Sequence, residues 1–156
     1  MIFVDCVFSQ TMYNMSMDIL SLPFNKFIGL ELSSDPAYLM SLPARVEYEN
    51  HLQTVHASAL FALAEASSGE FLLREFAEVE NAVPVVRNVE VKYRKPAKGM
   101  VSSTASLTTN KADVLETLQR KRRALVPVSV LLYDANAVLV MQATFEWFVL
   151  INDNNS

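Results

Sequence analysis

A run of apolar and small side chains from Ala57 to Gly69, broken by one charge at Glu65, constrains this chain most strongly. A helix that is apolar on every face must be wrapped by other structure. The run therefore predicts a buried central helix from Ala57 to about Val79, which the mainly polar residues 50–54 precede. Burying a carboxylate costs free energy unless it is paired or its pKa rises. Glu65 thus requires a catalytic or a structural reason for its position.

The segments before this helix predict short peripheral elements. Methionines and leucines at roughly helical spacing from Thr11 to Leu22 predict a short helix that Pro23 ends, with a loosely attached N-terminal arm as the alternative. Phe27 to Leu32 predicts a short strand, and alternation from Tyr38 to Val46 predicts a second one. Pro43 favours an edge position or a bulge for the second strand.

The segments after the helix predict an antiparallel sheet. Strand-like patterns occur in 85–94, 100–109, 125–133 and 139–149. Short turns join most of these runs, which is typical of antiparallel neighbours. Lys111 to Arg123 carries a helical apolar stripe, with a long, twisted hairpin connection as the alternative. The order of elements predicts an α+β fold in which one antiparallel sheet curls around one buried helix.

Composition favours a single domain over residues 1–156, with an N-terminal arm or helix at 1–26 and a core at 27–150. An apolar fraction of 51% lies at the upper edge of the globular range, which points to a buried interface as well as a core. A net charge of -4 gives no indication of nucleic-acid or anionic-membrane binding. The lone Cys6 excludes an internal disulfide and a multi-cysteine metal site. Without signal-peptide features or an 18-residue apolar run, we expect a soluble cytoplasmic protein with no membrane span.

Three segments of the sequence resemble the hotdog-fold acyl-CoA thioesterases, in particular the phenylacetyl-CoA type and a related uncharacterised hotdog group. Residues 50–69 are similar to the family's Asn-x(5)-His-Gly-Gly motif followed by an acidic helix residue. Residues 91–99 are similar to its Tyr-x-x-Pro-Ala-x-Gly strand and turn, and 128–134 with 138–147 resemble its final strand pair. The resemblance covers residues 27–150 and implies an antiparallel sheet of five to six strands wrapped around one long central helix. It also implies a homodimer or a dimer of dimers (a homotetramer).

The sequence departs from the family's pattern at a few positions. Ala57-Ser58 stands where thioesterases of this type often carry Gly-Gly, and Glu65 stands where many have Asp. A downstream Ser or Thr that some of them use falls near Val86. These changes bear on catalytic efficiency and not on the fold.

Hydrolysis of an acyl-CoA thioester requires a stabilised oxyanion and a base or nucleophile. Unpaired N–H groups at a helix N-terminus suit an oxyanion, so we expect the amides near His56, Ala57 and Ser58 to bind the thioester carbonyl. Glu65, Asn50 and His56 are the candidate catalytic residues. Asn50 is expected to bind the carbonyl or orient a water, and Glu65 to activate water or attack directly. Structural alternatives are a hydrogen-bonded carboxylate for Glu65, a helix cap or packing residue for His56, and a turn or cap for Asn50.

Helix geometry separates His56 from Glu65. The two residues are nine apart, so they lie about 180° around and roughly 13 Å along the helix from each other. They cannot serve one substrate carbon from the same helix. If both act, Glu65 comes from another subunit, which implies a two-fold dimer with active sites at the interface. The small residues around Glu65 would let another helix or a substrate approach closely.

Two basic segments are candidates for binding the phosphates of coenzyme A. Arg94, Lys95 and Lys98 form a compact basic turn, and Arg120–Arg123 is the second candidate, with a solvated charged turn as the alternative for each. We expect no cofactor apart from the coenzyme A of the substrate. We also expect no metal site, because the two histidines are five residues apart and form no cluster with the acidic residues, and we expect His51 to be an exposed loop residue.

The first functional prediction is an acyl-CoA thioesterase that releases a free acid and coenzyme A at a dimer interface. A second enzyme prediction uses the same scaffold to hydrate or dehydrate an acyl thioester, and the missing glycine-rich histidine loop disfavours it. A third prediction is a non-catalytic dimeric module that binds an acyl ligand, which the Ala57-Ser58 replacement keeps open. The sequence does not specify the chain length or aryl character of the acyl group.

Overall fold

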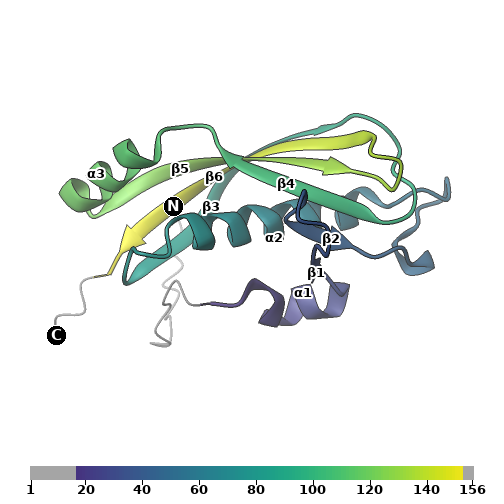
Figure 1. Cartoon of the computed structure of the whole chain (residues 1–156), viewed down its shortest axis with the longest axis horizontal. Helices are drawn as coiled ribbons and strands as arrows, with labels where there is room; N and C mark the ends of the chain where they lie inside the picture. Colours follow the sequence, from purple (N-terminus) through teal and green to yellow (C-terminus); the bar gives the residue numbers. More distant parts are fainter. Residues whose placement is uncertain (1–16, 153–156) are drawn as a thin grey trace, which may run out of the picture.

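The computed structural model describes residues 17–152, in which one antiparallel sheet curves over one long helix (Figure 1). The elements in chain order are η1 (Ile19–Ser21), α1 (Pro23–Ile28), β1 (Glu31–Leu32), β2 (Met40–Leu42), η2 (Val46–Tyr48), α2 (Ala57–Glu75), β3 (Ala82–Tyr93), β4 (Val101–Leu107), α3 (Lys111–Lys121), β5 (Arg123–Tyr133) and β6 (Leu139–Ile151). The six strands are ordered β1-β2-β4-β5-β6-β3, and each neighbouring pair is antiparallel. The predicted α+β class, the sheet of five to six strands and the central helix are confirmed.

The predicted elements of the C-terminal half all form, with small changes at their ends. The four predicted strands are β3, β4, β5 and β6. β5 and β6 lie inside the sheet, and their alternate residues face the core under α2. The segment from Lys111 is the helix α3, so the alternative of a hairpin connection is wrong. β3 lies at the edge of the sheet, which leaves one side of a 12-residue strand without a partner strand within residues 17–152.

The peripheral elements before α2 differ from the prediction. Pro23 begins α1 and does not end a helix, because a proline at the first helical position loses no hydrogen bond. Gly29 ends α1 with a φ of 68°, so the strand predicted from Phe27 shrinks to β1. β2 stops before Pro43, which has no N–H to donate. The part of the predicted N-terminal helix from 11 to 16 lies outside the described residues.

A buried pair of hydroxyl groups joins α2 to the sheet. The Ser67 hydroxyl lies 2.6 Å from the Leu63 carbonyl and 2.7 Å from the Ser103 hydroxyl of β4. Ser103 Oγ in turn accepts from the Met40 amide of β2 at 3.1 Å. Both serines are fully buried. One contact therefore ties the helix to two strands in a part of the core that no water reaches.

Small residues on α2 let neighbouring elements approach it closely. Trp147 Nε1 donates to Ser68 Oγ at 3.2 Å, and the Ser68 hydroxyl donates to the Glu65 carbonyl at 2.7 Å. A Cβ at Gly69 would lie 3.3 Å from Ile19 Cδ1 and 3.6 Å from Trp147 Cζ2. Ser68 and Gly69 are thus occupied by the protein's own side chains and are not open to another helix.

One face of α2 is uncovered. Ala57, Ser58 and Glu65 are exposed, so the expectation that the chain buries the Glu65 carboxylate is wrong for the single chain. The sheet covers one side of α2, and the six residues of α1 cover only part of the other. The predicted end of the helix near Val79 is also too late, because Phe76 caps it.

An ion-pair cluster holds α3 at the C-terminal end of α2. Lys111 Nζ lies 2.9 Å from Glu78 and 3.6 Å from Glu75, and 5.6 Å from the centre of the Phe76 ring. A backbone hydrogen bond and the hydrogen bond from Lys111 lower the pKa of Glu78. The bond to Glu78 raises the pKa of Lys111.

None of the helices within residues 17–152 is long and apolar enough to cross a membrane. The single domain over 1–156 and the cytoplasmic location stay predictions.

Replacing Ser103 with Ala should destabilise the protein more than replacing Ser67 with Ala. Ser103→Ala leaves the buried Met40 amide without its acceptor, which costs about 1–3 kcal/mol, whereas Ser67→Ala leaves that bond intact and costs about 0.5–1.5 kcal/mol. Urea unfolding of both variants measures the difference. Ser106→Ala, at an exposed position of the same strand, serves as the control and should change stability by less than about 0.5 kcal/mol. Equal losses for Ser103→Ala and Ser67→Ala would contradict the proposed link to β2.

Lys111→Gln should lower the melting temperature at pH 7 and have little effect at pH 3. Because the pKa of Glu78 is lowered in the folded state, its stabilising contribution is present above the unfolded value of 4.5 and is lost as the pH falls through the folded value. Calorimetric melting of wild type and variant at both pH values tests this. A difference in melting temperature that persists at pH 3 would show that the lysine stabilises the fold by packing over Phe76.

Candidate functional site

Two hollows adjoin at the N-terminal end of α2. The acid hollow, with a volume of about 430 Å³, is lined by Phe24, Ala57, Ser58, Phe61, Ala62, Glu65 and Tyr93. The basic hollow, of about 330 Å³, is lined by Asn50, Leu52, Thr54, Val55, Ala57, Leu60, Tyr93, Arg94, Lys95, Pro96 and Ala97. Ala57 and Tyr93 line both. A ligand that occupies both hollows therefore lies across these two residues.

The acid hollow is built on one face of α2. Ser58, Phe61 and Glu65 follow one another at helical spacings of three and four, so they form one stripe. Phe24 of α1 and Tyr93 of β3 complete the walls, which gives the hollow three aromatic rings and one carboxylate. Among the described residues that line it, Glu65 alone is charged. The hollow thus suits an uncharged apolar group next to an acid or base.

The basic hollow lies where β3 ends and the following turn begins. Arg94 Nη2 donates to Gln142 Oε1 at 2.7 Å, which directs the guanidinium toward β6. Lys95 is exposed beside it. Both predicted cations thus line the same hollow as the loop residues that precede α2, and an anionic group in this hollow would meet two positive charges.

The N-terminus of α2 leaves one backbone donor free. The His56 amide donates to the Tyr48 carbonyl at 2.7 Å. The Ser58 amide donates to Nδ1 of His56 at 3.0 Å, and the Ala59 amide to the His56 carbonyl at 3.0 Å. The Ala57 amide, at the first helical position, has no partner among the described residues. It lies at the junction of the two hollows, where the positive end of the helix dipole favours negative charge.

His56 caps α2 with its side chain. Because Nδ1 accepts from the Ser58 amide, the proton of the neutral ring is on Nε2. His56 does not line the acid hollow, in agreement with the angular separation from Glu65. The observed contacts of His56 are those of a helix cap, the structural alternative given above. A catalytic role of His56 stays a prediction. His51 is exposed in the loop, as expected.

Asn50 builds the turn before the helix. Its Oδ1 accepts from the Leu52 amide at 2.8 Å and the Thr54 amide at 3.3 Å, and its Nδ2 lies 3.0 Å from Thr54 Oγ1. These bonds match the turn-forming alternative. Asn50 lines the basic hollow but not the acid hollow, so its predicted contact with a carbonyl or a water stays untested.

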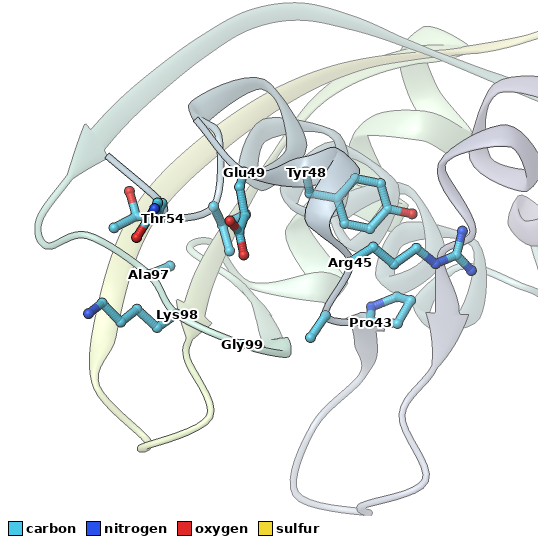
Figure 2. Close-up of a pocket in the computed structure, with 11 residues that line it drawn as sticks. Pro43, Arg45, Tyr48, Glu49, Thr54, Ala97, Lys98 and Gly99 are labelled. Atoms are coloured by element: carbon cyan, nitrogen blue, oxygen red, sulfur yellow. The ribbon is translucent and has the colours of Figure 1, made fainter. Parts of the chain in front are cut away.

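Lys98 lies apart from the other two cations of the predicted phosphate site. It lines a third hollow of about 210 Å³, together with Arg45, Glu49 and Thr54, on the other side of Ala97. Figure 2 shows Lys98 and Thr54 on one wall of this hollow and Arg45 on the other. The turn after Pro96 reverses the chain direction, so neighbours in sequence face different hollows.

Tyr93 is a site residue that sequence reasoning missed. In the strand pattern it alternates in phase with Val89 and Val91, and its hydroxyl lies 3.4 Å from the Ala57 carbonyl. Its place at the start of the Tyr-x-x-Pro-Ala-x-Gly motif was the available signal. Residues 17–152 hold no group of three or more His, Cys, Asp or Glu side chains arranged to bind a metal ion.

Solved structures of several bacterial proteins are similar to this fold. A Pseudomonas aeruginosa protein of unknown function, named a probable thioesterase, has 23% identity and a TM-score of 0.72, covering 86% of this chain and 91% of that chain. A Bacillus halodurans protein crystallised with CoA has 21% identity and a TM-score of 0.58, covering 71% and 70%. The E. coli PaaI protein of the phenylacetic acid degradation operon has 13% identity and a TM-score of 0.58, covering 78% and 84%. At these identities the likenesses establish the fold, and the predicted hotdog architecture is confirmed.

No curated protein is significantly similar in sequence to this chain. Residues 27–149 match the family described as "Domain of unknown function (DUF4442)". Since the match spans most of the chain, the protein belongs to the DUF4442 family.

Proposed function

We propose that the protein is an acyl-CoA thioesterase whose active sites lie at the interface of a homodimer. One observation carries the proposal: an uncommitted helix N-terminal amide, that of Ala57, lies where an aromatic, acid-containing hollow meets a basic one. The acyl group fits the first hollow, the phosphates of coenzyme A fit Arg94 and Lys95 of the second, and the thioester spans the junction. The solved structure of a similar fold with CoA supports this choice of ligand.

The chemistry follows from the Ala57 amide at the junction and a Glu65 carboxylate. The Ala57 N–H stabilises the negative charge that develops on the carbonyl oxygen. Glu65 removes a proton from a water molecule, and the water oxygen forms a bond to the carbonyl carbon. The C–S bond then breaks, the coenzyme A thiolate takes up the proton, and the carboxylic acid remains. Direct attack by Glu65, with a transient anhydride that water then cleaves, gives the same products.

Within a single chain, the Ala57 amide and the Glu65 carboxylate lie too far apart to act on one thioester. Ala57 and Glu65 are eight residues apart, or about 12 Å along the helix axis. The glutamate side chain spans less than half of that distance. The Ala57 amide and the Glu65 carboxylate of one chain therefore cannot both contact one thioester.

A two-fold dimer removes this separation. The stripe of Ser58, the half-buried Phe61 and Glu65 is centred near Phe61, so two copies that cross there in opposite directions place Glu65 opposite the partner's helix N-terminus. The edge strand β3 supplies a second surface for the same pairing, because its free backbone groups can pair with those of a second β3. The exposed apolar side chains Val85 and Phe24 also favour an interface on this side. A dimer of dimers stays a further alternative.

A binding protein without turnover is the second candidate. The Ser58 amide donates its hydrogen bond to the His56 side chain. The N-terminus of α2 therefore offers one backbone N–H to an oxyanion instead of several. That observation favours reduced catalysis and leaves ligand binding unaffected. Tight binding of acyl-CoAs with no thiol release across a panel of substrates would select this alternative.

Glu65→Gln should reduce thiol release from acyl-CoAs by at least about 100-fold, because the amide cannot accept a proton from water. A thiol-reactive dye measures the release. Glu70→Gln, on the same helix but outside both hollows, is the matched control and should retain activity. Unchanged release by Glu65→Gln would remove Glu65 from the mechanism.

Ala57→Pro should reduce kcat by about 100-fold, since proline removes the free N–H. The helix should tolerate it: proline suits the first helical position, and His56 already has the extended conformation that precedes proline (φ -63°, ψ 140°). Ala57→Val adds similar bulk and keeps the N–H, so it should retain most of the activity.

Mixing the Ala57→Pro and Glu65→Gln variants tests the dimer. If each site takes its amide and its carboxylate from different subunits, random re-pairing restores roughly a quarter of wild-type activity, because half of the dimers have one intact site of two. No recovery after subunit exchange, or sedimentation as a monomer at micromolar concentration, would contradict the shared site.

A further inference from the structure

The N-terminus of α2 is short of donors for an oxyanion. Efficient stabilisation of a tetrahedral intermediate generally uses more than one hydrogen-bond donor, each contributing about 10²–10³ in rate. Here the amides of His56 and Ser58 are committed within the chain, and only the Ala57 amide is available. Asn50 is tied to its own turn. A second donor must come from another element that reaches the junction.

Tyr93 is the side chain that meets this requirement. It is the one residue besides Ala57 that lines both hollows. Ser58 also carries a hydroxyl, but it lines only the acid hollow. Arg94 and Lys95 line only the basic hollow. Within residues 17–152, Tyr93 is therefore the only hydroxyl-bearing residue common to the two hollows.

The Tyr93 hydroxyl is weakly engaged and well positioned. Its distance of 3.4 Å to the Ala57 carbonyl oxygen exceeds the usual range for an O–H donor, so turning away from this acceptor costs little. The phenol ring stands on β3, where Tyr93 pairs with Met141 of β6 and the next amide donates to Val140. A donor on a paired strand is held more rigidly than one on a loop. The side chain is 53% exposed, which leaves the hydroxyl accessible to a ligand.

We propose that Tyr93 is a catalytic residue whose hydroxyl, together with the Ala57 amide of the same chain, binds the oxyanion of the thioester intermediate. The assignment rests on the proposed thioesterase function. It explains how the chain can catalyse hydrolysis with Ala57-Ser58 at the helix N-terminus. The Tyr93 hydroxyl from the sheet replaces the Ser58 amide, which already donates to His56. The hydroxyl donates a hydrogen bond and transfers no proton, so the bonds formed and broken are those of the hydrolysis itself.

Tyr93→Phe is the direct test. It removes the donor and retains the ring, so kcat for an acyl-CoA substrate should fall about 100-fold while KM changes less than about threefold. Tyr38→Phe is the matched control, because Tyr38 packs on Tyr133 outside both hollows, and it should retain wild-type kcat. Replacement of Tyr93 by 4-aminophenylalanine restores an N–H donor at the same place and should recover most of the lost kcat, which a purely structural role of the hydroxyl would not predict.

The outcomes separate this assignment from the proposed function. Thiol release by wild type with an unchanged kcat in Tyr93→Phe overturns the assignment and leaves the thioesterase function intact. A rise in KM alone, or a loss of kcat that 4-aminophenylalanine does not restore, also overturns it. No thiol release by wild type from any acyl-CoA overturns the thioesterase function, and the assignment with it.

Discussion

The position of α2 depends on the buried hydroxyl pair of Ser67 and Ser103. Dispersion contacts between apolar side chains are individually weak and not directional. The hydroxyl pair is directional and lies in a fully buried environment, where an unpaired polar group is costly. It therefore helps to fix the height and rotation of α2 relative to β4 and β2, together with the bond from Trp147 to Ser68. The candidate-site residues on α2 depend on this placement of the helix.

The same rotation decides which face of α2 is left uncovered. With Ser67 directed to the sheet, the stripe that contains Ser58 and Glu65 faces away from it. The short α1 then leaves that stripe accessible and adds Phe24 to its rim. The exposed carboxylate is thus a consequence of how the core is fixed. In a dimer that covers this face, Glu65 would lie in the buried environment that its apolar neighbours in sequence suggest.

Much of the fold could be predicted because its elements repeat regular patterns. The long strands alternate, and the helix from Ala57 has an apolar run that only Glu65 interrupts, so periodicity and turn chemistry agree. The peripheral elements were predicted less well, since one residue there can reverse an assignment. Pro23 both ends and begins helices, and the sequence alone did not show which applied. The exposure of Glu65 depends on how much of the helix α1 covers, which no local pattern encodes.

The sequence identified several residues that line the candidate site, but not the contacts between them. Ala57, Ser58, Glu65, Arg94 and Lys95 all line the two adjoining hollows, as their motifs suggested. The separation of Lys98 from Arg94 arises from the reversal of the chain at Pro96, which is a three-dimensional effect. The commitment of the Ser58 amide to His56, and the approach of Tyr93 to Ala57, join residues on different elements. Such contacts depend on the three-dimensional positions of single atoms, which no local sequence pattern specifies.

Trp147 gives the molecule a built-in optical probe. It is the only tryptophan in the chain, and its indole N–H bonds to Ser68, whose hydroxyl bonds to the backbone carbonyl of Glu65. Indole emission responds to the hydrogen bonding and polarity around the ring. The fluorescence of the unlabelled protein therefore reports on the helical turn that carries the carboxylate, so that ligand occupancy of the acid hollow can be followed without a label.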